Sequence, residues 1–158
     1  MKRTIAIVDI HGGLKALKQV VERAAVSKND VLIFLGDYVD GWSESVDTID
    51  YLIELSVTHE CVFIKGNHDA WCEDFLLEGK ANETWLLHGG ASTYDKYEDI
   101  QMEKRKRHID FFKKMKLYYV DTENRLFIHA GFTSMKGPEQ EFYQTNFYWD
   151  RTLAQVLS

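Results

Sequence analysis

Cysteine, proline and long apolar runs are scarce in this chain, and each shortage excludes a class of protein. The two cysteines, Cys61 and Cys72, form no CxxC pair and are too few for a disulfide framework, which favours a reducing compartment. The apolar start MKRTIAIVDI is interrupted at Asp9, well short of the length of a secretory signal. No run approaches the length of a transmembrane helix. We therefore expect a soluble cytoplasmic protein that does not act at a membrane.

Low-complexity tracts and internal repeats are also missing, and the composition is that of a globular protein. The 158 residues are 45% hydrophobic and 28% charged, about one domain's worth of chain, so we expect a single domain spanning 1–158. The formal net charge of −6 argues against a nucleic-acid partner. An acidic protein can still handle phosphate groups, because bound metal cations can supply the local positive charge.

Three segments share one pattern, in which an apolar run is followed by a turn carrying Asp, Asn or His and then by helical spacing. They are TIAIVDIHGG, DVLIFLGDYVDG and CVFIKGNHDA. Apolar residues recur every three or four positions between them, as at Leu14, Leu17 and Val21. Crossover helices of this kind join parallel strands. The pattern predicts a βαβαβ unit whose parallel sheet is buried on both faces.

The rest of the chain predicts helices and then a hairpin. Helical spacing runs through the middle third and ends with a long helix over about residues 99–115. We interpret the basic run EKRKRH in that helix as a solvated face and not as a nucleic-acid surface. The strand-like runs LYYVD and RLFIHAGF flank a polar turn at 122–124, which is typical of a hairpin. A loop and a final helix are predicted to follow.

Polar and ionisable residues gather where the predicted strands end. They are Asp9, His11, Asp37, Asp40, Asn67, His68, Asp69 and His129. In open α/β sheets, ligands bind beyond the carboxyl ends of the strands, where the loops converge. Each residue taken alone fits a helix cap, a turn or a structural histidine. Those readings do not explain why one edge of one sheet collects all of them, so we interpret the group as a site.

The mixture of carboxylate, amide and imidazole groups suits a divalent transition metal better than calcium, which prefers oxygen alone. Two metal ions that share a carboxylate can activate a water molecule and hold a phosphoryl oxygen. Asp37 is our candidate for the shared ligand. Manganese is the metal we expect first, with iron, zinc, nickel and magnesium as alternatives.

Four motifs in these segments resemble the successive motifs of the calcineurin-like metallophosphoesterases. They are DIH at 9–11, GDYVDG at 36–41, GNHD at 66–69 and FIHAGF at 127–132. GNHDAW, WLLHGGASTYDKY and YWDR further resemble the bacterial serine/threonine protein phosphatases, a branch that also contains diadenosine polyphosphate hydrolases. The resemblance covers nearly the whole chain. It implies the α/β/β/α sandwich of that family, with mixed sheets flanked by helices.

The resemblance also implies a role for each site residue. Asp9, His11 and Asp37 would hold a first metal ion, and Asp37, Asn67 and His129 a second. His68 becomes the general acid for the leaving group, kept protonated by its partner Asp40. By the same resemblance, Asn67 and Arg151 would bind the substrate phosphate, unless Arg151 is an ordinary surface arginine.

Two departures from the family pattern bear on activity. The family often places a phosphate-binding arginine after Asp40, where this chain has Gly41. It also has a downstream Gly-His motif that completes the second metal site, and no histidine follows His129 here. The spare histidines His59, His88 and His108 offer no evident substitute. We therefore interpret the chain as lacking the C-terminal strands of the fold, either by truncation, which we favour, or as a natural short form with reduced or lost activity.

These features predict a metal-dependent phosphoester hydrolase of phosphoproteins, in which a metal-bound hydroxide attacks directly. One alternative is a hydrolase of diadenosine polyphosphate or another nucleotide, and another is an inactive remnant that binds metal or a partner. The aromatic residues of 71–97 and 131–149 either stack a base or simply pack the domain. The sequence leaves the oligomeric state open.

Overall fold

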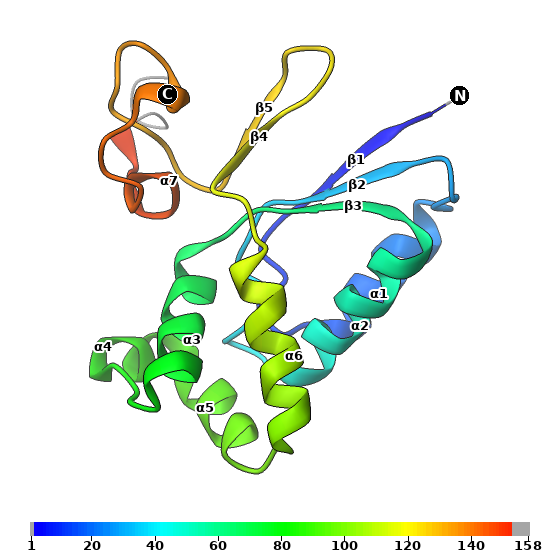
Figure 1. Ribbon diagram of the computed structural model, residues 1–158. Helices are drawn as coiled ribbons and strands as arrows, with labels where there is room; N and C mark the ends of the chain where they lie inside the picture. Colours follow the sequence, from blue (N-terminus) through cyan, green and yellow to red (C-terminus); the bar gives the residue numbers. More distant parts are fainter. Residues whose placement is uncertain (1, 153–158) are drawn as a thin grey trace.

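A parallel three-stranded sheet forms the framework of the protein in the computed structural model, which describes residues 2–152 (Figure 1). Its strands are β1 (Thr4–Ile7), β2 (Val31–Phe34) and β3 (Glu60–Phe63), in the order β1-β2-β3. Helices α1 (Leu14–Arg23) and α2 (Ser45–Thr58) make the crossovers. The strands pair in parallel, with Val31 opposite both Thr4 and Glu60. The βαβαβ prediction is confirmed.

The central strand β2 is buried on both faces, but its neighbours are not. Leu32 and Phe34 point into the main core, between the sheet and the helices. Val31 and Ile33 point the other way, into a smaller core. This second face is only partly covered, and Val8, just beyond β1, is 55% exposed. The predicted burial on both faces therefore holds for β2 alone, because a single hairpin is what reaches the second face (Figure 1).

Helical segments follow β3 and pack against the main core (Figure 1). They are α3 (Asn67–Glu78), α4 (Glu83–Trp85), the π-helical stretch η1 (Leu86–Gly90), α5 (Ala91–Glu98) and α6 (Met102–Lys113). α3 ends at Gly79, whose φ of 73° is the left-handed conformation that favours glycine. α6 is shorter than the predicted range 99–115. Gln101 is extended before it, and after it the Lys116 N–H donates to the carbonyl of Phe63 at the end of β3.

The basic run of α6 is only in part a solvated face: Lys106 and Arg107 are exposed, but two of its basic side chains also contact another helix. Lys104 and Arg107 both bind the carboxylate of Asp50 on α2, with Lys104 Nζ 2.7 Å from Oδ2. The imidazole of His108 is fully buried beside them, with Nε2 3.0 Å from Asp50 and Nδ1 2.8 Å from the hydroxyl of Tyr97. One carboxylate on α2 thus ties α6 in place, and α5 joins through Tyr97.

A hairpin and an irregular segment complete the described chain. β4 (Tyr118–Val120) and β5 (Leu126–Ile128) pair antiparallel, as predicted. The Asp121 carboxylate closes the turn by accepting the N–H groups of Glu123 and Arg125. The short 3-10 turn η2 (Pro138–Gln140) and the helix α7 (Asn146–Trp149) follow, and the rest of the predicted final helix, 153–158, lies outside the described residues. Within 2–152, no helix combines the length and hydropathy that crossing a membrane requires.

Candidate metal centre

The turns after β1 and β2 hold four of the predicted site residues in a strained backbone conformation. Asp9, His11, Asp37 and Asp40 have φ values of 46°, 48°, 55° and 75°. Residues with side chains rarely adopt this left-handed region, and those held there cluster at functional sites. The two turns are joined, because the N–H of His11 donates to the carbonyl of Asp37 at 2.8 Å. The strain is therefore maintained by contacts between distant segments.

Gly36 allows the turn after β2 to approach two other segments. Its φ is 98°, and a Cβ there would lie 2.6 Å from the nitrogen of Gly66 and 2.8 Å from Nδ1 of His129. Both distances are shorter than real Cβ contacts. Only glycine fits where the ends of β2, β3 and β5 converge.

Asp69 holds the turns after β2 and β3 together, a role that the sequence pattern alone does not assign. Its fully buried carboxylate accepts backbone hydrogen bonds from Asp37, Tyr38 and Gly66, at 2.7, 2.9 and 2.8 Å. Burial and the nearby charge of Asp37 raise the pKa of Asp69, and the three N–H groups act in the opposite direction. The signal in the sequence is an acid three residues after the helix cap at Gly66, where a capping box places one.

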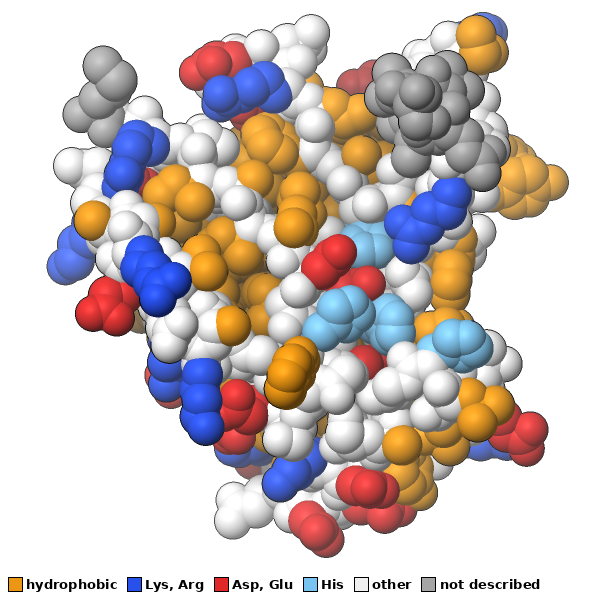
Figure 2. Space-filling view, turned by 180° about the vertical axis from the view of Figure 1, so that it is seen from behind, with side chains coloured by type: hydrophobic (Ala, Val, Ile, Leu, Met, Phe, Trp, Pro, Cys, Tyr) orange, Lys and Arg blue, Asp and Glu red, His pale blue; other side chains and the backbone are white. Residues whose placement is uncertain are grey.

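Two groups of potential metal ligands share Asp37. One contains His11, Asp37 and His68, the other contains Asp9, Asp37 and His129, and in each group the ligand atoms lie within 4.8 Å of one another. Figure 2 shows histidines and carboxylates gathered in one place on this face of the molecule. The grouping differs from the predicted ligand sets, in which Asp9 accompanies His11 and not His129. Asp37 is the common member in both.

Hydrogen bonds orient two histidines so that their second nitrogens face Asp37. Nδ1 of His11 lies 3.2 Å from the Val39 carbonyl, and Nδ1 of His129 lies 2.7 Å from the Leu35 carbonyl. A carbonyl oxygen only accepts, so each Nδ1 carries a proton, and in the neutral form of such a ring the lone pair is at Nε2. These Nε2 atoms lie 3.7 and 3.6 Å from Oδ2 of Asp37. Imidazole lone pairs facing a carboxylate oxygen at this distance fit a divalent cation.

Asn67 adds an amide oxygen beside His129. Asn67 is the buried first residue of α3, and its Oδ1 lies 3.2 Å from Nε2 of His129. Because Nδ1 of the neutral ring carries the proton, both atoms in this contact are acceptors. A cation between them would satisfy both. The geometry therefore favours Asn67 as a ligand, which stays a prediction.

His68 and Asp40 form a pair beside these groups. Nδ1 of His68 lies 2.6 Å from Oδ2 of Asp40, whose side chain is fully buried. Burial lowers the pKa of His68, but the hydrogen bond to Asp40 and the charge of Asp37 outweigh it, so the pKa is raised. With Nδ1 bound to Asp40, Nε2 is the nitrogen that can deliver a proton.

The remaining candidates lie apart from the ligand groups. Arg151 is exposed just beyond α7, and within residues 2–152 its guanidinium makes no hydrogen bond or ion pair. Its predicted phosphate contact stays a prediction. His59, His88 and His108 bind other parts of the fold, and none of the three joins a ligand group.

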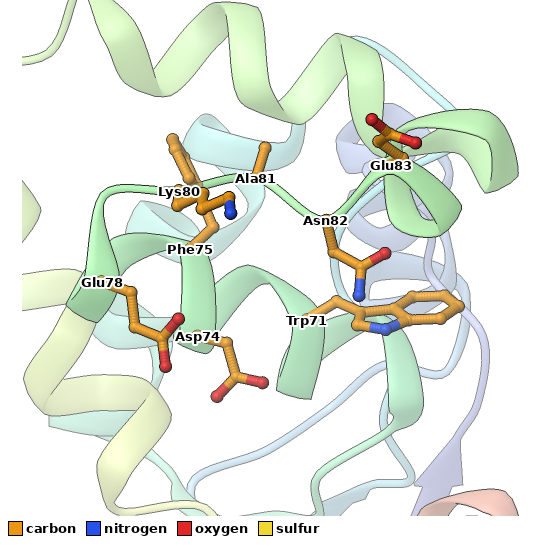
Figure 3. A pocket seen from close by; sticks show the side chains of 8 residues that line it. All are labelled: Trp71, Asp74, Phe75, Glu78, Lys80, Ala81, Asn82 and Glu83. Atoms are coloured by element: carbon orange, nitrogen blue, oxygen red, sulfur yellow. The ribbon is translucent and has the colours of Figure 1, made fainter.

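A cavity of about 370 Å³ lies along α3, with the indole of Trp71 as one wall (Figure 3). The Trp71 ring centroid is 5.4 Å from that of His68 and 4.8 Å from that of Trp149 on α7. Four charged side chains also line it, the carboxylates of Asp74, Glu78 and Glu83 and the ammonium of Lys80, and Phe75, Ala81 and Asn82 complete the lining. His68 and the predicted metal ligands do not line this cavity, and Trp71 is the lining residue that contacts His68.

Comparison with known proteins finds relatives along nearly the whole chain. The family model for calcineurin-like phosphoesterases matches residues 2–155. A symmetrical bis(5'-nucleosyl)-tetraphosphatase of Pseudomonas fluorescens is 30% identical over 130 residues, which cover 81% of this chain and 42% of the relative. Serine/threonine-protein phosphatase 2 of Escherichia coli is 32% identical over 96 residues, which cover 60% of this chain and 42% of the relative. The chain spans less than half the length of these curated relatives.

A solved structure shares the fold. It is a protein serine/threonine phosphatase from Saccharomyces cerevisiae with similarity to human phosphatase PP5, and its TM-score with this chain is 0.63. The match covers 94% of this chain and 51% of the other, at 14% sequence identity. The likeness establishes a common α/β architecture, as the four motifs predict.

Proposed function

The chain belongs to the calcineurin-like phosphoesterase family, and we propose that it is a metal-dependent phosphomonoesterase acting on phosphorylated proteins. The observation that carries this proposal is the pair of ligand groups sharing Asp37, placed beside the His68–Asp40 pair. One assembly thus offers room for cations and a proton donor. Manganese is the expected metal, and the cytoplasm is the expected compartment.

Two divalent cations are the cofactors that the donor set fits. The residues that would hold them are Asp9, His11, Asp37, Asn67 and His129. When bound, such cations supply positive charge for the phosphoryl oxygens and lower the pKa of an attacking water molecule. Asp37 suits a shared ligand because hydrogen bonds from its N–H to Asp69 and from His11 to its carbonyl fix its turn.

His68 is the residue that we assign to proton transfer. Its raised pKa keeps the ring protonated to a higher pH than an ordinary histidine. Asp40 occupies Nδ1, so the proton at Nε2 is the one that passes to the leaving oxygen of a seryl or threonyl side chain. The ring of Trp71 stands nearly perpendicular to the imidazole, with the two centroids 5.4 Å apart.

No arginine follows Asp40 in this chain, so other residues must bind the substrate phosphate. Gly41 takes that position with a φ of 73°, and a Cβ there would lie 3.4 Å from the side chain of His11. A larger residue would be strained in this conformation. We assign the phosphate to the amide of Asn67 and to the guanidinium of Arg151, which can bind a dianion through two parallel hydrogen bonds.

A nucleotide substrate is the second candidate function. The Pseudomonas fluorescens relative is a tetraphosphatase by name, and the ring of Trp71 offers a surface on which a base could stack. A polyphosphate chain that extended past that ring into the cavity would be repelled by Asp74 and Glu78. A chain that binds metal without turnover is the third candidate, since the two groups of potential ligands would hold cations whether or not a substrate is turned over.

Three substrates assayed with Mn²⁺ separate these functions: p-nitrophenyl phosphate, a phosphoserine peptide and diadenosine tetraphosphate. We expect turnover of the first two. Turnover of diadenosine tetraphosphate alone would establish the nucleotide function, and no turnover by the metal-loaded protein would leave only the binding function.

A substitution at His68 tests the assigned roles. His68→Ala should keep its bound Mn²⁺, measured by titration calorimetry, and lose most turnover. Loss of the metal instead would make His68 a ligand, in line with its place beside His11. His59→Ala is the matched control, because His59 lies before β3 at the opposite end of the sheet, and it should change neither property.

A further inference from the structure

A buried tryptophan binds the same carboxylate oxygen as His68. Nε1 of Trp85 donates to Oδ2 of Asp40 at 2.7 Å, and Nδ1 of His68 lies 2.6 Å from that oxygen. Trp85 and Asp40 are both fully buried. Among the described residues, the other oxygen, Oδ1, has no hydrogen-bond partner. The indole is therefore the one group besides His68 that fixes the orientation of this carboxylate.

The segment from α4 to α5 is built to bring the indole to Asp40. The Asn82 side chain starts α4 by accepting the backbone N–H of Trp85 and of the residue before it. Gly90 then passes so close to the ring that a Cβ there would lie 2.5 Å from Cε2 of Trp85. Gly89, with a φ of 100°, breaks the helix and accepts the N–H of Gly41.

The same segment also holds the backbone of Asp40. The N–H of Asp40 donates to the hydroxyls of Ser45, at 3.0 Å, and Thr93, at 3.1 Å, and these two hydroxyls lie 2.8 Å apart. Thr93 belongs to α5, and Ser45 is the first residue of α2. The backbone and the carboxylate of Asp40 are thus held independently, the first by hydroxyls and the second by an indole.

From this geometry we propose that Trp85 is a positioning residue for the reaction, acting on His68 through Asp40. The proposal rests on the proposed function. A carboxylate held by one donor can turn about its terminal bond and carry the imidazole with it, whereas two donors on one oxygen fix its plane. Trp85 thereby keeps Nδ1 of His68 engaged and Nε2 directed to the leaving group.

Comparison of two substrates tests the proposal in Trp85→Phe, which removes the N–H and keeps an aromatic ring. Phenyl phosphate releases a more basic leaving group than p-nitrophenyl phosphate and depends more on proton delivery. The ratio of kcat on p-nitrophenyl phosphate to kcat on phenyl phosphate should rise about tenfold. This ratio does not depend on how much of the sample is folded, so partial unfolding cannot imitate the effect. An unchanged ratio would overturn the proposal.

Two further variants separate positioning from packing. Phe75→Leu loosens the same core, because the Phe75 ring lies 5.4 Å from that of Trp85, but it keeps the indole hydrogen bond and should leave the ratio unchanged. In a His68→Ala background, Trp85→Phe should have no further effect on the ratio. Gly90→Ala pushes the indole away without removing it and should raise the ratio if Trp85→Phe does not fold.

A measurement without turnover distinguishes failure of this proposal from failure of the proposed function. The ¹⁵N shifts of His68 report which ring nitrogen carries the proton. At a pH high enough to make the ring neutral, the wild-type protein should show the remaining proton at Nδ1, and Trp85→Phe a mixture of tautomers. If no phosphate ester is hydrolysed but the shifts change in this way, the function is wrong and the positioning role stands. Identical shifts in both proteins would refute the positioning role, whatever the activity.

Discussion

Replacing Asp69 by asparagine tests whether one buried carboxylate holds the turns of the ligand groups. The side chain keeps its size, but one of its two oxygens becomes an NH₂ group. Oδ2 now accepts from Asp37 and Gly66, and Oδ1 accepts from Tyr38. If the amide oxygen keeps the first two bonds, the NH₂ group faces the N–H of Tyr38, and two donors meet without an acceptor.

The free energy of unfolding of Asp69→Asn should fall by about 3 kcal/mol. An unsatisfied buried N–H costs about 1–3 kcal/mol, and the two remaining bonds lose the assistance of a full charge. In a protein of this length each kcal/mol lowers the melting temperature by roughly 2–4 °C, so we expect a decrease of about 6–12 °C. Because the Asp37 turn is loosened, Mn²⁺ should also bind roughly tenfold more weakly.

Asp30→Asn is the matched control for this prediction. Asp30 is also a buried aspartate, and its carboxylate accepts hydrogen bonds from Arg3 and Ser27 at the opposite end of the sheet. Calorimetric unfolding and Mn²⁺ titration of both variants give the comparison. Both should unfold at a lower temperature, but only Asp69→Asn should bind the metal more weakly. Equal metal affinities in the two variants, or an unchanged melting temperature for Asp69→Asn, would refute the reasoning.

Three other substitutions probe different parts of the structure. Gly36→Ala should cost about 3 kcal/mol or more in chemical denaturation, because its Cβ would meet backbone at 2.6 Å in a left-handed conformation. Burial raises the pKa of Asp50, but the hydrogen bonds from His108 and Lys104 outweigh burial, and the pKa falls to about 2. Its stabilisation is therefore present above about pH 4 and is lost as the pH falls towards 2, so Asp50→Asn should flatten acid unfolding followed by circular dichroism. Arg151→Ala should raise KM for a phosphopeptide several-fold with no change in melting temperature, and an unchanged KM would make it a surface arginine.

The elements that follow from local patterns are the ones that could be predicted from the sequence. Three apolar runs that end in turn residues gave the strands of the parallel sheet, and the polar turn at 122–124 gave the hairpin. Boundaries and surfaces set by distant contacts could not be predicted in this way. α6 ends three residues before Lys116, whose N–H donates to the end of β3. Lys104 and Arg107 of its basic run form ion pairs with Asp50 on another helix.

In the candidate site, too, local patterns predict some features, whereas features set by distant contacts could not be predicted. The strand-end rule places Asp9 and Asp37 at one edge of the parallel sheet, because it depends on topology, which the alternation of strands and helices reveals. His129 does not follow that rule, because it comes from the separate β4–β5 hairpin and lies beside them through the contact of its Nδ1 with the carbonyl of Leu35. Which ligand faces which depends on left-handed turns, and so the sequence does not group Asp9 with His129. The bond of Asp69 to Gly66 follows from local spacing, but its bonds to Asp37 and Tyr38 and the bond of Trp85 to Asp40 join residues more than thirty positions apart, which no local spacing encodes.

Four carboxylates, those of Asp9, Asp37, Asp40 and Asp69, converge at the end of this small sheet, and their mutual repulsion shapes the site. Burial and the charge of Asp37 raise the pKa of Asp69. A cation held by Asp37 would offset that repulsion, and its binding energy would add to the stability of the turns. Asp69 and Trp85 are not among the predicted cation ligands, and their role is to hold other residues in place. Asp69 and Trp85 hold the turns and the proton donor in place against this repulsion, which is why substitutions there should affect metal affinity and proton delivery separately.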